Sequence, residues 1–167
     1  MEIKIEKLKQ KDLPAFYAVF KRSLFGDFKE YSPQMATFKW KQHRKNHLMR
    51  WIKEGSEVVF LAKDKDEKVV GFLTTDAVFG GVAYCDWLIV DRSYQGLGIG
   101  GRMLKFWEKW AKKNQAHMLD LTCDKRNLPF YQKFGFKKYG FVKEGYCNES
   151  NYLLAKKIGH WNPKSLQ

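Results

Sequence analysis

A glycine-rich segment carries the residue types and the spacing that bind phosphate. Four glycines lie within residues 96–101, after an apolar run that ends near Val90 and before residues 103–113, where apolar side chains recur at helical spacing. Glycine lets backbone N–H groups approach a ligand, and a helix start offers unpaired N–H groups and the positive end of its dipole. Arg102 adds a full positive charge. The segment predicts a phosphate-binding loop between a strand and a helix.

Three nucleotide-binding patterns compete for this loop. The dinucleotide pattern G-x-G-x-x-G matches residues 96–101, with Asp120 about as far downstream as a ribose-binding acid. However, residues 91–95 separate the loop from its strand, whereas that fingerprint follows its strand almost directly. The ATP-binding pattern G-x-x-x-x-G-K-[ST] is absent from the sequence. The third pattern, Q/R-x-x-G-x-G/A, matches residues 95–100 and fits best.

This loop and a second motif together resemble the GNAT superfamily of acetyltransferases. Residues 130–136 read F-Y-Q-K-F-G-F and resemble the F/L-Y-x-K-x-G-F signature that closes the cofactor site of that family. The resemblance covers nearly the whole chain, from Ile3 to Ile158. It implies an α+β (three-layer α/β) fold with a mixed, mostly antiparallel sheet of about seven strands and about four helices. It also implies a single domain over residues 1–167, of which residues 158–167 form a loose tail.

The activity that the resemblance implies is acetyl transfer from acetyl-CoA to a primary amine, directly within a ternary complex. Tyr131 is expected to protonate the departing thiolate, and Asp86 to remove the proton of the amine, with Asp120 as the alternative base. Many members carry an asparagine where this chain has Lys125. The expected cofactor-binding residues are Leu88, Ile89, Val90, Gln95, Gly96, Leu97, Gly98, Ile99, Gly100, Gly101, Arg102, Asn127 and Tyr131. The expected substrate-binding residues are Phe25, Phe28, Tyr31 and Tyr84.

Cysteine and histidine spacing predicts no metal site. The three cysteines are widely spaced, and Cys85 and Cys123 lie in apolar runs typical of the core. His43 and His47 are one helical turn apart, but the basic pair between them disfavours a divalent cation and no third ligand is evident.

Composition and charge narrow the class of protein. Apolar residues make up 44% and aromatic residues 16% of the sequence, which excludes disorder. The net charge of +13 favours an anionic partner such as a polyphosphate cofactor, nucleic acid or anionic lipid. A CoA-responsive or nucleic-acid-associated binding module on the same fold therefore remains the alternative to an enzyme. We expect a cytoplasmic protein without a membrane segment; a homodimer and the identity of the acceptor stay open.

The elements that must position these residues follow from hydrophobic periodicity and turn signals. The pattern predicts one long basic helix from Ser32 to Glu54, stopped by Gly55, and a hairpin around the turn at residues 64–67. Asp12 is expected to cap the start of the helix predicted for residues 12–24. The other predicted helices cover residues 12–24, 103–113 and part of 127–136, and the predicted strands cover residues 2–8, 57–63, 68–75, 83–90, 117–123, 136–142 and 152–158.

Overall fold

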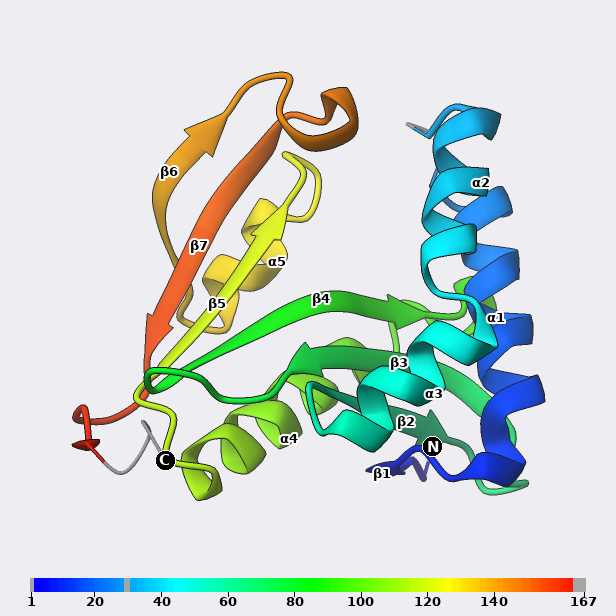
Figure 1. Cartoon of the computed structure of the whole chain (residues 1–167), viewed down its shortest axis with the longest axis horizontal. Coiled ribbons are helices and arrows are strands. Elements are labelled where there is room, and N and C mark those ends of the chain that lie inside the picture. The colour runs from blue at the N-terminus through cyan, green and yellow to red at the C-terminus, as the bar shows by residue number, and fades with distance from the viewer. Residues whose placement is uncertain (1, 29–30, 164–167) are drawn as a thin grey trace. The chain divides into compact units, whose positions relative to one another are not determined.

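One sheet holds the seven strands found in the described residues, 2–28 and 31–163 of this computed structural model, in the order β1-β2-β3-β4-β5-β7-β6 (Figure 1). Of the strand pairings with a defined register, β4 with β5 is parallel and the others are antiparallel, which confirms the mixed, mostly antiparallel sheet. The strands are β1 (Lys4–Lys7), β2 (Glu57–Lys63), β3 (Val69–Asp76), β4 (Val82–Val90), β5 (Met118–Cys123), β6 (Lys137–Val142) and β7 (Asn151–Lys157). The α-helices are α1 (Leu13–Gly26), α2 (Pro33–Gln42), α3 (Lys45–Glu54), α4 (Ile99–Lys113) and α5 (Leu128–Lys133).

The chain divides into two compact units. Unit 1 lies within residues 1–74 and 87–103, and unit 2 within residues 75–86 and 104–167. β4 and α4 each contribute residues to both units. No helix in the described part of the chain has the length and apolar character that a membrane crossing requires.

The core of unit 1 forms where α1 packs on β3. Phe16 and Phe20 form the inward face of α1, where each is only 1% exposed. Both rings meet Phe72 of β3, with ring centroids 4.6 and 5.5 Å apart. Because both faces of β2 and β3 are covered, nearly every residue in them is buried, as in a strand inside a layered fold.

A buried lysine ties the first elements of unit 1 together. The ammonium of Lys63, only 1% exposed, donates to Glu6 Oε1 and to Asp12 Oδ1, both at 2.9 Å. Asp12 stands at the N-cap of α1 as predicted, but its carboxylate makes no capping bond there. Its Oδ1 accepts from Lys63 instead, and its Oδ2 accepts from the backbone N–H of Lys9 at 3.4 Å. The ion pair is needed because an unpaired charge in that position would be costly.

The long helix predicted from Ser32 to Glu54 is wrong, because it is broken into α2 and α3. The predicted ends are confirmed: the Ser32 hydroxyl accepts from the N–H of Met35, and Gly55 closes α3 in the left-handed region at φ 76°. Between them, Arg44 takes an extended conformation with ψ 149°, which interrupts the helical hydrogen bonds. The split gives five helices in the described residues, not about four.

Unit 2 is built on β5, β7 and β6 together with most of α4. β5 pairs with β4 over Val82–Cys85 and with β7 along its whole length. β6 and β7 pair in antiparallel fashion, with a register shift between Lys138 and Gly140 that marks a β-bulge. The completely buried Trp107 of α4 stacks on Phe136, with centroids 6.3 Å apart.

Candidate active site

The glycine loop of unit 1 has the geometry of an anion-binding site. Gly96 and Gly98 adopt φ values of +79° and +77°, which residues with a side chain rarely reach, and a Cβ at either position would meet nothing within 4 Å. The glycines therefore serve the backbone conformation and leave the loop surface open. α4 starts at Ile99, earlier than predicted, and the N–H of Arg102 donates to the carbonyl of Gly98. The N–H groups of residues 99–101 precede that bond and lack intrahelical acceptors.

Side chains on both sides of the loop hold it in place. The Gln95 amide donates to the carbonyl of Val90 at 3.0 Å, which links the loop to the end of β4. Asp91 accepts from the N–H of Ser93 and from the Arg22 guanidinium. Burial favours a raised pKa for the Asp91 carboxyl, but these hydrogen bonds hold the pKa below its ordinary value. Sequence reasoning missed Arg22, since no local signal marks a contact between α1 and this loop.

The Arg102 side chain is directed elsewhere than the resemblance suggests. Its guanidinium donates to the carbonyl of Ile3 at 2.6 Å and so holds the start of the chain. The geometry therefore supports a role for Arg102 in cofactor binding through its position in the first turn of α4, and not through the charge of its side chain. The Leu97 side chain, unlike that of Arg102, lies at the open surface of the loop, where it is 57% exposed.

The end of β4 in unit 1 carries the segment predicted to bind the pantetheine arm, residues 88–90. The Ile89 side chain points into the core and is 4% exposed, while Leu88 and Val90 are half-buried. β3 approaches this segment closely because residue 71 is a glycine: a Cβ there would lie 2.7 Å from the carbonyl oxygen of Ile89. This contact with β3 fixes the backbone of the segment.

Tyr131 of α5 is held within unit 2 by aromatic rings. Its ring meets Phe130 and Phe136 edge-on, with centroids 5.1 and 5.9 Å apart. Phe136 stacks on Trp107, whose indole N–H donates to the Thr75 hydroxyl at 2.9 Å. Tyr131 therefore rests on a chain of buried groups that leads back to β3.

The surroundings of the Tyr131 hydroxyl keep it protonated. Burial raises the pKa of Tyr131 well above its ordinary value of 10.0, and negative charge on Cys85, Cys123 or Asp124 would raise it further. A phenol in such a place holds its proton at neutral pH, so its hydroxyl is present as a hydrogen-bond and proton donor. Cys85 and Cys123 are buried as predicted.

Both carboxylates that the sequence predicts as candidates for the base belong to unit 2. Asp86 is exposed, whereas Asp120 is half-buried directly opposite Tyr84 in the pairing of β4 with β5. The Tyr139 hydroxyl lies 3.0 and 3.2 Å from the two oxygens of Asp120, to which it donates. Burial raises the pKa of Asp120, although the bond from Tyr139 opposes this. Tyr139 was missed, but Gly140 within a strand pattern is the signal of a bulge that could redirect it.

Asn127 stands at the N-cap of α5, and its amide is already engaged. Its side-chain Nδ2 donates to Asp124 Oδ2 at 3.2 Å, and its backbone N–H donates to Asp124 Oδ1 at 2.8 Å. These bonds shape the turn before Tyr131. Lys125, which takes the place of the family asparagine, is exposed.

The structure brings two of the predicted substrate-binding residues together in unit 1 and leaves a third apart. The rings of Phe28 and Tyr31 stack with centroids 4.9 Å apart, and Trp87 meets Phe28 edge-on at 5.9 Å. Phe25 is 50% exposed and instead meets Trp40. The fourth, Tyr84, belongs to unit 2, where its hydroxyl lies 3.3 Å from that of Thr122.

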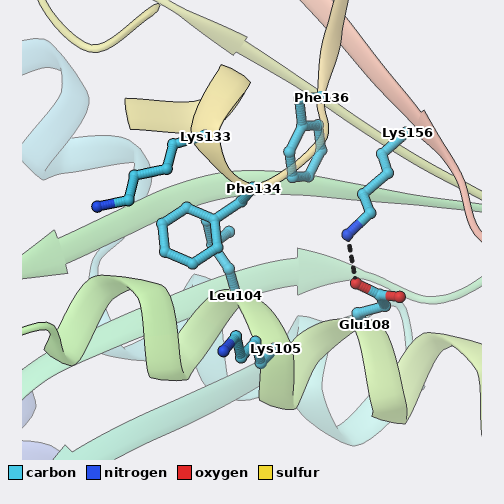
Figure 2. A pocket seen from close by; sticks show the side chains of 7 residues that line it. All are labelled: Leu104, Lys105, Glu108, Lys133, Phe134, Phe136 and Lys156. Atoms are coloured by element: carbon cyan, nitrogen blue, oxygen red, sulfur yellow. Dashed lines mark hydrogen bonds and ion pairs between the residues drawn. The ribbon is translucent and has the colours of Figure 1, made fainter. Parts of the chain in front are cut away.

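A positively charged pocket of about 250 Å³ opens in unit 2 (Figure 2). Phe134, Phe136 and Leu104 provide apolar walls, while Lys156 binds Glu108 at 2.6 Å. Neither of the two other lysines of the pocket has a carboxylate partner among the residues that the structure describes. The pocket could therefore accept an anionic group. Its lining residues are Leu104, Lys105, Glu108, Lys133, Phe134, Phe136 and Lys156.

Metal chemistry has no support in the side-chain arrangement. In the described ranges, no three histidine, cysteine, aspartate or glutamate side chains gather as metal ligands would. His43 instead makes hydrogen bonds to Trp87 and to the backbone of α2.

A strand, an open glycine loop and a helix start whose first N–H groups lack intrahelical acceptors are features that suit a phosphate-bearing ligand. The model of the acetyltransferase (GNAT) family matches residues 13–136. The chain belongs to the GNAT family of acetyltransferases. It is an enzyme that uses acetyl-CoA, as the resemblance implied.

Solved structures share the fold at low sequence identity. A PaiA N-acetyltransferase from Thermoplasma acidophilum, in complex with coenzyme A, is 23% identical, with a TM-score of 0.77 over 94% of this chain and 99% of that chain. The ribosomal-protein-S18-alanine N-acetyltransferase from Escherichia coli is 19% identical, with a TM-score of 0.70 over 97% of each chain. A spermidine N-acetyltransferase SpeG chimera from Vibrio cholerae and hSSAT is 13% identical, with a TM-score of 0.75 over 95% of this chain and 96% of that chain. No curated protein matches the sequence.

Proposed function

We propose that this protein transfers the acetyl group of acetyl-CoA to a primary amine by direct attack within a ternary complex. The observation that carries the proposal is Tyr131, whose ring is held by Phe130 and Phe136 and whose raised pKa keeps the hydroxyl protonated, in a family that uses a thioester donor. Acetyl-CoA supplies an activated carbonyl and a thiolate leaving group. Tyr131 gives its proton to the departing sulfur, and a carboxylate takes the proton that the amine must lose.

Backbone groups bind the donor in this proposal. The N–H groups of residues 96–102 seat the diphosphate, which is supported by the open left-handed glycines and by the start of α4. The backbone of residues 88–90 pairs with the pantetheine arm, and one of its N–H groups polarises the thioester carbonyl. Asn127 has the weakest support among the proposed cofactor contacts, because Asp124 occupies its amide.

Asp86 is the base that the sequence favours, and Asp120 is the second candidate. Burial favours Asp120, because it raises the pKa of the carboxyl and makes it the stronger base, although the bond from Tyr139 lowers that pKa. Replacing each aspartate with asparagine separates them. The variant that removes the base should lower kcat by roughly 100-fold or more and abolish the acidic limb of the pH–rate profile, while the other keeps that limb.

The acceptor is proposed to be a primary amine that contacts Phe28 and Tyr31, with Phe25 and Tyr84 as further contacts. Acceptors named for structures of the same fold include spermidine and the alanine of a ribosomal protein, so both small and protein amines belong in the test. A cytoplasmic location is part of this proposal. The family assignment favours this enzyme over the non-catalytic binding module.

Thiol release from acetyl-CoA, measured across a library of amines, tests the proposal. Tyr131→Phe should slow release by roughly 100- to 10,000-fold while leaving thermal stabilisation by acetyl-CoA intact. Tyr146→Phe is the matched control, because Tyr146 also lies in unit 2 but is 61% exposed. Full activity of Tyr131→Phe would overturn the proposed acid, and absence of stabilisation by acetyl-CoA would overturn the proposed donor site.

A further inference from the structure

His43 joins the break between α2 and α3 to β4, and both contacts lie within unit 1. Its Nε2 lies 3.1 Å from the indole Nε1 of Trp87, and its Nδ1 lies 3.0 Å from the carbonyl oxygen of Lys39. The ring occupies the position where α2 ends, just before the extended Arg44. The His43 side chain therefore connects the break between α2 and α3 to β4, the strand that ends with residues 88–90.

The chemistry of the two partners determines the protonation state of the ring. A backbone carbonyl only accepts a hydrogen bond, so Nδ1 must carry a proton. An indole N–H only donates, so Nε2 must offer its lone pair. A neutral imidazole satisfies both partners at once. An imidazolium places an N–H against the Trp87 N–H, and the bond between His43 and Trp87 is lost.

The groups around His43 favour the neutral ring. α1, α3 and β4 present the aromatic rings of Phe20, Trp51 and Trp87, at centroid distances of 5.3, 6.0 and 5.7 Å. The charged group facing it is the ammonium of Lys39 on α2. Burial lowers the pKa of the His43 imidazole, the hydrogen bond to the Lys39 carbonyl opposes this, and the Lys39 charge lowers it further, for a net shift below 6.5.

Trp87 in turn shapes the aromatic surface assigned to the acceptor. Its ring meets Phe28 edge-on, and Phe28 stacks on Tyr31. The Lys39 ammonium lies 5.1 Å from the Tyr31 ring centroid and 5.5 Å from that of Trp87, so the same lysine contacts both rings. The orientation of the Trp87 indole therefore decides how Phe28 and Tyr31 are supported.

We propose that neutral His43 is a positioning residue for acceptor binding: it holds the Trp87 indole against Phe28, and its protonation releases Trp87 and weakens the binding of the acceptor. This inference rests on the proposed function, because it takes Phe28 and Tyr31 as acceptor contacts. Since the neutral ring is required, the effect sets in as the pH falls below the ordinary histidine value of 6.5.

Intrinsic fluorescence tests the bond without any substrate. A histidine cation beside an indole quenches its emission, so the folded wild type should show a fluorescence step below pH 6.5. The step should be absent in His43→Gln, because the glutamine amide accepts the same bond without titrating, and it should be smaller in Trp87→Phe, where Trp51 still lies 6.0 Å from His43. All of these proteins are compared in the His47→Gln background, because the exposed His47 ring lies 6.1 Å from that of Trp51 and would quench it independently. Persistence of the step in His43→Gln, or its absence from the wild type above the acid unfolding transition, would overturn the inference.

Steady-state kinetics tests the consequence for the acceptor. In His43→Leu at pH 8, the acceptor KM should rise roughly tenfold, the factor that corresponds to a lost hydrogen bond of about 1.4 kcal/mol, with kcat and the KM for acetyl-CoA within about twofold. His43→Gln should restore the acceptor KM and also remove its rise at low pH. A fluorescence step without any change in acceptor KM would refute the role of His43. Failure of every amine to react would instead refute the proposed function, while the fluorescence result would still decide the bond between His43 and Trp87.

Discussion

Two adjacent threonines of β3 offer a sharp test of the packing around Tyr131. Thr74 and Thr75 are both buried, at 1% and 0% exposed. The Thr75 hydroxyl accepts from Trp107 Nε1 at 2.9 Å and lies 2.7 Å from the carbonyl oxygen of Tyr84, to which it donates. The Thr74 hydroxyl has no hydrogen-bond partner among the described residues. The same substitution to valine should therefore have opposite effects at the two positions.

The structure sets the size of each effect. Thr75→Val leaves the Trp107 N–H and the Tyr84 carbonyl without this partner, and a buried unsatisfied group costs about 1–3 kcal/mol. Because a carbonyl can use its second lone pair, we expect a total loss of about 2–4 kcal/mol, or roughly 10 °C in Tm for a chain of this size. Thr74→Val removes a hydroxyl that is already unsatisfied, so its free energy of unfolding should stay unchanged or rise by up to about 1 kcal/mol.

Urea unfolding followed by tryptophan fluorescence measures both variants against the wild type. Thr75→Val should also lower kcat more than Thr74→Val does, because Trp107 supports Phe136 and Phe136 contacts Tyr131. Equal destabilisation by the two valines would refute the reasoning, because burial alone would then explain both losses. A neutral Thr75→Val would show that the Trp107 bond contributes nothing.

Other predictions address the ion pairs of unit 1 and the glycine loop. Lys63→Met should lower the free energy of unfolding by about 3–5 kcal/mol, because it removes the cation that pairs with the buried Asp12, whereas Lys65→Met at an exposed turn should be neutral in the same urea titration. Hydrogen bonds from Lys63 and Lys4 lower the pKa of Glu6 from 4.5 to about 2. The contribution of Glu6 to stability is therefore complete above pH 4.5 and is lost as the pH falls towards 2. Glu6→Gln should flatten the dependence of the free energy of unfolding on pH in this range, and an unchanged slope would contradict the prediction. Gly98→Ala should cost about 1–2 kcal/mol at its left-handed φ and reduce the thermal shift with acetyl-CoA, while Gly26→Ala should leave that shift intact.

The agreement between sequence and structure is best where local chemistry decides the conformation. Ser32 starts α2 and Gly55 ends α3, as their side chains predict, because capping and left-handed backbone depend on neighbouring residues. The predicted helix between them is nevertheless broken into α2 and α3. Its basic sequence pattern does not reveal this break, nor the hydrogen bond between His43 and Trp87 that lies beside it. That bond joins residues far apart in the chain, and helical periodicity cannot report it.

The sequence by itself determined the class of enzyme, because a loop of glycines before a helix and the Phe130–Phe136 motif are local patterns whose chemistry does not depend on distant contacts. Only the tertiary structure decided how the side chains are used. It turned Arg102 towards the Ile3 carbonyl and placed Tyr139 on Asp120 through a bulge. The physical reason is that folding brings together residues that are far apart in the chain. The burial and the hydrogen bonds that result set the pKa of a side chain, and the sequence identifies only the type of that side chain.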